Sequence, residues 1–380
     1  MHDVLIIGSG VIGMSIARQL SQSHLDIAIV DRDIPGMHAS YKAGGMLGAQ
    51  NEFTTDSELF QLAVASRSLF PELSDALYHE TGIDIEFQQS GLIKMASSTK
   101  DVKWLTQQYA FLKSKDPSVE LLSDDELFNL SNGHVEPTDL AIYIPKDGQI
   151  NANHYTKALL QSIIQRDVHH YYQTEVKHIH HNNGFYTVTT NNGFYTVTTN
   201  NGDIHAKKVI VAGGGWSTQL LKDYAIPRQV IGVKGEVLLV EQPSLKLNHT
   251  VFMTNGCYIV PKEKHRYLIG ATSEFNNYSV GNSDLGISWL LNHAQQRIPG
   301  LSNGHILKQW SGIRPYTEHE LPIMDQIDDG LFIITGHYCN GILLSPKIGQ
   351  DIANWLLSGI KPVSYSAFSL SRSEQNEVHH

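Results

Sequence analysis

Three glycines near the N-terminus have the spacing of a phosphate-binding turn. Gly8, Gly10 and Gly13 form a G-x-G-x-x-G pattern, in which the first glycine permits a tight strand-to-helix turn and the second lets a pyrophosphate approach the backbone. The third lets the helix lie close to the strand. Asp31, about twenty residues further on, can accept hydrogen bonds from a ribose 2′-hydroxyl and would repel a 2′-phosphate. These residue types in this order predict a binding site for a dinucleotide.

The segments around these residues predict the strand–helix–strand unit that such a site requires. Val4–Ile7 is a short apolar run typical of a strand buried on both faces, and it leads directly into the first glycine. Apolar residues then recur at helical intervals over Val11–Leu20, and a second apolar run, Ile27–Val30, ends at Asp31. The N-terminus of the helix would offer free N–H groups and a partial positive charge to phosphates. A glycine pattern alone is weak, but all of these parts together favour a βαβ dinucleotide unit.

Composition restricts the class of protein. The 380 residues are 41% hydrophobic, enough for one large globular unit or two domains, and the net charge of −10 disfavours a nucleic-acid partner. The two cysteines, Cys257 and Cys339, cannot build a disulfide framework and fit a reducing compartment. The chain enters its first strand at once, and no apolar run approaches the roughly 20 residues that span a bilayer. We therefore expect a cytoplasmic protein without a signal peptide or a membrane partner.

The chain contains 20 histidines, a residue type that can ligate metals. The pairs at 169–170, 180–181 and 379–380 lie in polar surroundings, where solvated surface is the preferred interpretation. We expect no metal site.

The remaining apolar pattern alternates between helices and strands. We expect helices at 57–81, 99–115, 153–166 and 285–297, a capped helix that follows Ser123, and a last helix at 349–357. Strands are expected at 85–87, 92–95, 141–144, 209–212, 229–241, 257–261, 267–270 and 331–335.

This order predicts an α/β (overall α+β) fold in which a mainly antiparallel β domain is inserted into a Rossmann-like nucleotide-binding domain. The discontinuous nucleotide-binding domain would comprise residues 1–82, 147–224 and 312–380. The substrate-binding domain would comprise residues 83–146 and 225–311.

A nine-residue duplication interrupts this pattern. NNGFYTVTT occurs at 182–190 and again at 191–199, and a third NNG follows at 200–202. Alternating side chains and Asn-Gly pairs favour a strand meander locally. However, inserting one strand into a hairpin reverses the next strand, and 209–212 must join the main sheet in a fixed direction. We therefore expect one copy in a strand position, while the other extends the hairpin or loops out.

A series of short motifs stands in a fixed order along nearly the whole chain. Besides the N-terminal pattern they are AGGMLGA (43–49), VIVAGGGW (209–216), VKGE (233–236), CYIVPK (257–262), GAT (270–272), GIRP (312–315) and GHYCNGILLSP (336–346). In this order they resemble the FAD-dependent D-amino-acid oxidase superfamily, and within it most closely the bacterial glycine oxidases of thiamine biosynthesis. The duplication is not part of the resemblance.

The resemblance implies tightly but non-covalently bound FAD. The ADP half would be held by the turn and the end of the second strand, at Gly8, Gly10, Val11, Ile12, Gly13, Asp31 and Arg32. The flavin would be cradled by Ala39, Ser40, Gly44, Gly45 and Met46, and Val176 would lie near the adenine through its backbone. The backbone of His337, Tyr338, Cys339, Asn340, Gly341, Ile342 and Leu343 would lie beside the flavin ring. For Gly44, Gly45 and Gly341, simple turn glycines are the alternative.

Two residues match the family's substrate-binding positions. Arg314 lies in the apolar, proline-bounded GIRP motif, and a planar guanidinium suits bidentate binding of an α-carboxylate. Tyr258, in CYIVP, matches a pocket tyrosine whose hydroxyl can bind the same carboxylate. The alternatives are a surface salt bridge for Arg314 and a core position for Tyr258.

The implied reaction is the oxidation of glycine and small amines or D-amino acids such as sarcosine and D-alanine. Hydride would pass from the substrate Cα to flavin N5, and catalysis would consist of positioning. The imine would hydrolyse to an oxo-acid and ammonia, and molecular oxygen would yield hydrogen peroxide. The partners are then a small amine or amino acid and oxygen, and we expect a homo-oligomer.

Two positions depart from the family pattern. Cys339 stands where GH-[FY]-RNGILL has arginine, and Ser273 stands where GATM has methionine. Both border the family's substrate pocket, so the resemblance implies the reaction type but not glycine as the preferred substrate.

Two other functions stay open. The first is a D-amino-acid or sarcosine dehydrogenase that passes electrons to a membrane quinone, which the lack of a basic or amphipathic membrane patch disfavours. The second is a non-catalytic flavin-binding module, supported by Cys339 and Ser273 alone, and disfavoured because Arg314 and Tyr258 are retained.

Overall fold

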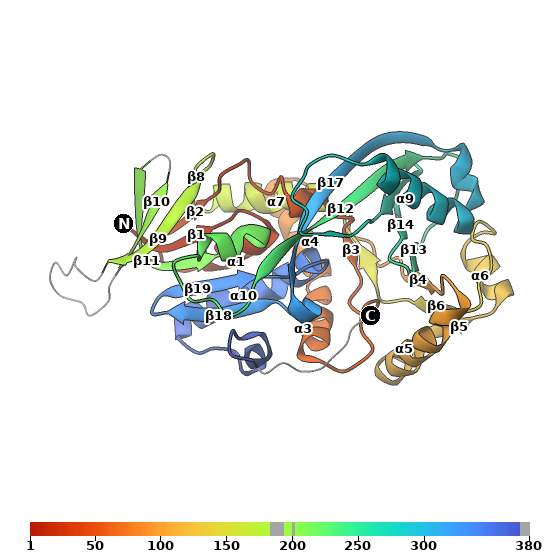
Figure 1. Cartoon of the computed structure of the whole chain (residues 1–380), viewed down its shortest axis with the longest axis horizontal. Coiled ribbons are helices and arrows are strands. Elements are labelled where there is room, and N and C mark those ends of the chain that lie inside the picture. The colour runs from red at the N-terminus through yellow and green to blue at the C-terminus, as the bar shows by residue number, and fades with distance from the viewer. Residues whose placement is uncertain (183–193, 200–201, 373–380) are drawn as a thin grey trace.

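The computed structural model describes residues 1–182, 194–199 and 202–372, and two β-sheets dominate it (Figure 1). Figure 1 shows the sheets toward opposite ends of the long axis, with β12 and β17 extending from the middle of the molecule into the second sheet. None of the helices in these residues is long and apolar enough to cross a membrane.

The first sheet, as far as it is described, has the strand order β18-β19-β11-β1-β2-β8, and β10 joins it between β11 and β9. β1 is parallel to β2 and to β11, and β11 is parallel to β19, as expected for strands linked by crossover helices. The strands are β1 (His2–Ile7), β2 (Ile27–Val30), β8 (His169–Tyr171), β9 (Val176–Asn182), β10 (Phe194–Thr199), β11 (Gly202–Val211), β18 (Ile323–Asp328) and β19 (Leu331–Thr335).

Helices cover this sheet because their apolar faces pack on its buried strands. α10 packs on α1 and α3, and α7 packs on α1 and α4. These helices are α1 (Val11–Leu20), α2 (Ala39–Lys42), α3 (Glu58–Arg67), α4 (Phe70–Thr81), α7 (Ala152–Gln165), α8 (Ser217–Leu220) and α10 (Gly341–Ser358). β3 (Met46–Leu47) and β7 (Gly148–Gln149) pair antiparallel and form a separate two-stranded sheet.

The second sheet is antiparallel except at one strand pair, β13 with β4. Its order is β16-β12-β15-β14-β13-β4-β6-β5, and β17 pairs with β12 over nearly its full length. The strands are β4 (Leu92–Met95), β5 (Glu120–Leu122), β6 (Ala141–Ile144), β12 (Val230–Glu241), β13 (Thr250–Met253), β14 (Tyr258–Lys262), β15 (Arg266–Gly270), β16 (Glu274–Phe275) and β17 (His305–Thr317). The helices that follow these strands are α5 (Val102–Lys115), α6 (Asp124–Leu130) and α9 (Asp284–Arg297). Short 3₁₀ turns are η1 (Thr99–Asp101), η2 (Gly214–Trp216), η3 (Pro299–Asn303), η4 (Glu318–Glu320) and η5 (Val363–Phe368).

The mixed α/β fold class is thereby confirmed. The first sheet takes its strands from 2–30, 169–211 and 323–335, and the second from 92–144 and 230–317. The domain boundaries given above stay a prediction, and β17 runs across the one at residue 312.

Several elements differ from the expected ones for identifiable reasons. The helix expected at 57–81 is two helices, because Pro71 lacks the N–H of a helix interior and instead occupies the first turn of α4. The helix expected at 349–357 begins at Gly341, and Pro346 lies inside it. Pro346 would leave the Ile342 carbonyl unbonded, and the Ser345 hydroxyl donates to that carbonyl at 2.9 Å. Residues 85–87 form no strand; Glu86 has a positive φ of 56°.

The duplication contributes one described strand. Phe194–Thr199 of the second copy forms β10, which is antiparallel to both β9 and β11. β11 keeps its parallel pairing with β1, as the topological argument requires. Residues 183–190 of the first copy lie outside the described residues, so the expectation for that copy stays a prediction.

Candidate active site

The glycine-rich turn has the geometry that its spacing predicts. Gly8 has a φ of +107°, and a Cβ there would lie 2.4 Å from the Ala212 carbonyl oxygen. A Cβ on Gly13 would lie 2.0 Å from the Gly8 oxygen, so α1 can lie this close to the end of β1 only with glycine at position 13. Gly10 precedes α1 and makes no side-chain cap, and the Val11 N–H donates to the Ser40 hydroxyl at 3.0 Å. The N-terminus of α1 therefore presents backbone donors toward a ligand.

Asp31 lies at the end of β2 beside this turn. Its Oδ2 accepts hydrogen bonds from the N–H and the hydroxyl of Ser9, both at 2.7 Å, and its Oδ1 accepts from the Asp33 N–H at 3.0 Å. The role of Ser9 was not predicted, although a small polar residue inside the glycine pattern is a usable signal. The Arg32 guanidinium lies 4.1 Å from the centroid of the Trp216 ring, a cation–π contact, and the His38 ring lies 5.3 Å from the same ring.

A single cavity of about 1210 Å³ brings most of the expected site residues together. It extends from the turn at Gly8, past Met46 and the 337–342 segment, to Tyr258, Ser273 and Arg314. Of the expected cofactor and pocket residues, Gly13, Asn340 and Leu343 do not line it. Gly13 supports the turn from behind, and Leu343 is buried in the core.

The segments expected to hold the flavin line the middle of the cavity. Gly45 has a φ of +80°, and a Cβ there would lie 2.1 Å from the Ile150 oxygen, so it is also a structural turn glycine. Gly341 has no positive φ, and a Cβ there would meet only the His337 Cβ, at 3.9 Å. The surrounding chain therefore does not require glycine at 341, whereas close approach of a ligand would. His337 is 4% exposed, its Nε2 has no hydrogen-bond partner among the described residues, and burial lowers its pKa to about 3.

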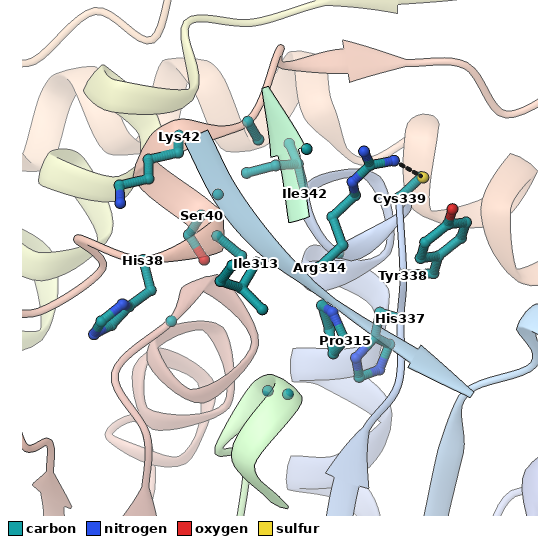
Figure 2. A pocket seen from close by; sticks show the side chains of 18 of the residues that line it. His38, Ser40, Lys42, Ile313, Arg314, Pro315, His337, Tyr338, Cys339 and Ile342 are labelled. Atoms are coloured by element: carbon teal, nitrogen blue, oxygen red, sulfur yellow. Dashed lines mark hydrogen bonds between the residues drawn. The ribbon is translucent and has the colours of Figure 1, made fainter. Parts of the chain in front are cut away.

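Arg314 reaches the cavity from β17, and Figure 2 shows it extending toward Cys339, with Tyr338 close by. One guanidinium nitrogen donates to the Thr272 carbonyl and another donates to the Cys339 sulfur at 3.4 Å. Within the described chain, its hydrogen-bond partners thus include no carboxylate. The Tyr338 ring centroid lies 5.4 Å from the Arg314 Cζ. This arrangement speaks against the surface salt bridge and leaves the positive charge available to a ligand.

Gly235 makes room for this arginine, a role that the sequence did not reveal. It lies on β12, and a Cβ there would be 2.3 Å from the Arg314 Nη2. The VKGE motif was the only sign of its importance. Gly235 also lines the cavity.

Tyr258 begins β14 and faces the cavity between two glycines. A Cβ on Gly270 would lie 2.5 Å from the Tyr258 hydroxyl, and one on Gly44 would lie 3.2 Å from its ring. The ring stacks on Phe252, with centroids 5.9 Å apart. Burial raises the pKa of Tyr258, so its hydroxyl stays a neutral hydrogen-bond donor.

The two positions that depart from the family pattern lie together. Burial raises the pKa of the Cys339 thiol to about 12, so at neutral pH it is an uncharged neighbour of Arg314. Ser273 lines the cavity and hydrogen-bonds Tyr338, a contact that opposes the rise in the Tyr338 pKa caused by burial.

The charged groups of this cavity that were not predicted include Glu52, Lys94 and Glu320. Glu52 follows the 39–46 segment expected to hold the flavin, and its Oε2 accepts a hydrogen bond from the Asn340 side-chain amide at 2.9 Å. Lys94 on β4 is 2% exposed, and its ammonium lies over the rings of Trp104 and Phe252. Glu320 lies in η4. They escaped notice because nothing in their local sequence distinguishes them from surface charges.

Comparison with known proteins decides the family. Residues 3–355 match the family described as DAO, the FAD-dependent oxidoreductases. The chain belongs to this family. It is 36% identical over 374 residues to a glycine oxidase of Geobacillus kaustophilus, covering 98% of this chain and 97% of that protein. It is 27% identical to the glycine oxidase of Bacillus subtilis (strain 168), with 99% of each chain covered. The crystal structure of the Geobacillus protein superposes with a TM-score of 0.91 at 36% identity, over 98% of this chain and 99% of that one.

Family membership confirms FAD as the cofactor of this oxidoreductase and, with the relatives above, the class of FAD-dependent amino-acid oxidase. The residues present fit that group. Gly10 at the N-terminus of α1, Asp31 and Gly341, where the surrounding chain does not require glycine, all line the cavity.

Proposed function

We propose that the protein oxidises glycine and other small amines or amino acids, such as sarcosine and D-alanine, with molecular oxygen as electron acceptor. The observation that carries this proposal is the Arg314 guanidinium, which lines the cavity and has a carbonyl and a thiol as its described hydrogen-bond acceptors. A substrate carboxylate would supply the counter-ion. The relatives named glycine oxidase support the same substrate class.

The proposed roles follow from the chemistry of these side chains. Arg314 would donate two parallel charge-assisted hydrogen bonds to the substrate carboxylate, and the neutral Tyr258 hydroxyl would donate another. Holding the carboxylate at these points would fix the orientation of the Cα–H bond. Bound FAD supplies the hydride acceptor, and its reoxidation by oxygen gives hydrogen peroxide. The imine product would hydrolyse to an oxo-acid and ammonia.

The pathway is a further part of the proposal. Some relatives are described as bifunctional ThiO/ThiG proteins, of which the chain spans 55% in the example from Trichormus variabilis. Together with the resemblance described above, this name supports a role in thiamine (thiazole) biosynthesis. Cys339 and Ser273 leave the order of preference among the small substrates to experiment.

Anaerobic reduction of the flavin tests the proposal. Purified yellow protein is mixed with glycine, sarcosine, D-alanine or D-proline without oxygen, the loss of flavin absorbance is followed, and air is then admitted. Loss of colour followed by rapid recovery with peroxide supports the oxidase, and Arg314→Gln should require far higher substrate concentrations. Slow recovery in air would favour a dehydrogenase with another acceptor. A yellow protein that no amine reduces would favour the non-catalytic flavin-binding module.

Two finer expectations also remain proposals. Action in the cytoplasm is supported by the two cysteines, both of which are free. Self-association is tested by size-exclusion chromatography with light scattering.

A further inference from the structure

The end of the cavity at Arg314 and Tyr258 also contains the side chain of Glu52, which has no part in the proposed binding of the substrate carboxylate. Glu52 lines the cavity, and the Asn340 side-chain amide fixes its Oε2 at 2.9 Å. Asn340 itself belongs to the 337–343 segment expected beside the flavin. Glu52 is therefore held in place from the segment where oxidation would occur.

Charged and titratable groups face Glu52 from every element around it. They are Lys94 on β4, Tyr258 on β14, Arg314 on β17, Glu320 in η4 and Cys339 next to Asn340. Burial raises the pKa of Glu52, while the Asn340 hydrogen bond and the positive charges of Lys94 and Arg314 oppose that rise. Tyr258 and Cys339 are neutral near pH 7, since burial raises both of their pKa values.

The pair of Arg314 and Glu52 matches the charges of an amino-acid zwitterion. Both side chains line one cavity, and each lies within electrostatic reach of the other. A zwitterion whose carboxylate binds Arg314 carries an ammonium group two bonds away, and that group needs an acceptor. Glu320 is the other carboxylate close to Arg314, and loss of solvation raises its pKa to about 7, but no hydrogen bond from a described residue fixes its position.

We propose that Glu52 binds the substrate ammonium group and accepts one of its protons, so that the amine is neutral when the Cα–H bond is oxidised. This inference rests on the proposed function and identifies a residue for one step of it. In that step an N–H bond of the ammonium breaks, its electron pair stays on nitrogen, and the proton forms an O–H bond on the Glu52 carboxylate. No electrons leave the substrate at this stage. The step explains how a site without a strong base can use the zwitterion that predominates at neutral pH.

Lys94 adjusts the charge of Glu52. Its ammonium donates to the Asn51 carbonyl and lies 4.7 Å from the Trp104 ring centroid and 5.4 Å from that of Phe252. Burial lowers the pKa of Lys94 to about 7 against the attraction of Glu52 and Asp147. The Asn51 carbonyl also accepts from Gln108 at 2.7 Å, so replacing Lys94 by methionine leaves that carbonyl bonded.

The test is the pH dependence of flavin reduction in the FAD-loaded protein, with whichever of glycine, sarcosine, D-alanine and D-proline reduces the parent. The measured quantity is the second-order rate constant of reduction at low substrate concentration. In the parent it should be flat between the pKa of Glu52 and that of the substrate amine. Glu52→Gln can still accept the Asn340 hydrogen bond but cannot take a proton, so it should use only free amine. Its rate constant should then rise about tenfold per pH unit, and two units below the amine pKa it should be about 100-fold below the parent.

Three further variants complete the design. Glu320→Gln removes a carboxylate from the same cavity and should keep the flat profile. Glu52→Asp restores an acid and should restore the flat region. Lys94→Met removes a positive charge beside Glu52 and should move the acidic limb of the profile to higher pH. Flavin absorbance per protein monitors folding in each variant.

Each outcome decides the matter. A parent protein that no amine reduces overturns the proposed function and this inference together. If the parent is reduced and Glu52→Gln shows the same pH dependence of the rate constant, the inference alone is overturned. It is also overturned if the rate constant of Glu320→Gln rises steeply with pH while that of Glu52→Gln stays like the parent's. If Glu52→Gln does not hold FAD, an unshifted limb in Lys94→Met overturns the inference, and a shifted limb supports it.

Discussion

Replacing Gly235 by alanine should displace the guanidinium of Arg314, the residue proposed to bind the substrate carboxylate. The new methyl group would lie 2.3 Å from the Arg314 Nη2 and 2.9 Å from its Cζ, distances that real Cβ atoms do not show. β12 and β17 are paired on both sides of this position, so the strands cannot separate locally. The guanidinium is the part that must move.

The size of the effect follows from what the arginine would lose. A hydrogen bond to a charged partner contributes about 1.5–3 kcal/mol, so losing one of the two bonds to a carboxylate weakens binding about 10- to 150-fold. We therefore expect a strongly raised dissociation constant for glycine in a protein that still folds and binds FAD.

The assay is anaerobic flavin reduction over a range of glycine concentrations, together with binding of glycolate, which keeps the carboxylate and lacks the amine. Both dissociation constants should rise by the same factor, because Arg314 would bind the group that the two ligands share. Gly300→Ala is the control, since a Cβ there makes only an ordinary contact, 3.6 Å from Leu245. Unchanged glycolate binding in a folded, yellow Gly235→Ala protein would refute the proposed binding of the carboxylate by Arg314.

Three further predictions concern other parts of the structure. Tyr258→Phe should weaken glycolate binding about 10- to 150-fold through loss of one hydrogen bond to the charged carboxylate, with FAD content unchanged. Burial raises the pKa of Glu80, but hydrogen bonds from Arg166 and Arg18 outweigh it and lower this pKa from 4.5 to about 2. Its contribution to stability is therefore present above pH 4.5 and lost as the pH falls from 4.5 to 2, and Glu80→Gln should flatten urea-unfolding free energies in that window. Deleting residues 183–191 should raise the free energy of unfolding by about 1–1.5 kcal/mol. Asn182 pairs with Phe194, and the deletion would shorten the connection between them to a two-residue Asn-Gly turn. An unfolding temperature below that of the parent would contradict this prediction.

Elements with a strong local signal could be predicted, and those set by distant contacts could not. The βαβ unit at the N-terminus is readable because each of its steps, from Gly8 to Asp31, has a local cause. The start of α10 is not, because Pro346 argues against a helix until the Ser345 hydroxyl is known to satisfy the freed carbonyl. In the same way, Pro71 divides a continuous apolar pattern into α3 and α4.

The site shows the same division between local and distant causes. Arg314 and Tyr258 could be named because their motifs resemble a known family. Gly235 and Glu52 could not be singled out, since the contact of the first with the Arg314 guanidinium and that of the second with Asn340 join residues far apart in the chain. A glycine or an acid has no distinctive local pattern, so its role appears only when the fold has brought its partner close.

The duplication is a case in which strand direction can predict the structure and local strand and turn propensities cannot. Two identical copies have identical turn and strand propensities, so no local rule can choose between them. Chain direction limits how many copies can form a strand. β11 must run parallel to β1 and β19. β10 is antiparallel to both β9 and β11, so β9 and β11 run in the same direction. One strand between β9 and β11 keeps that relation, and a second full strand would reverse it. Because the second copy directly precedes β11, it is the one that can pair with β11 through a short connection, and it supplies β10.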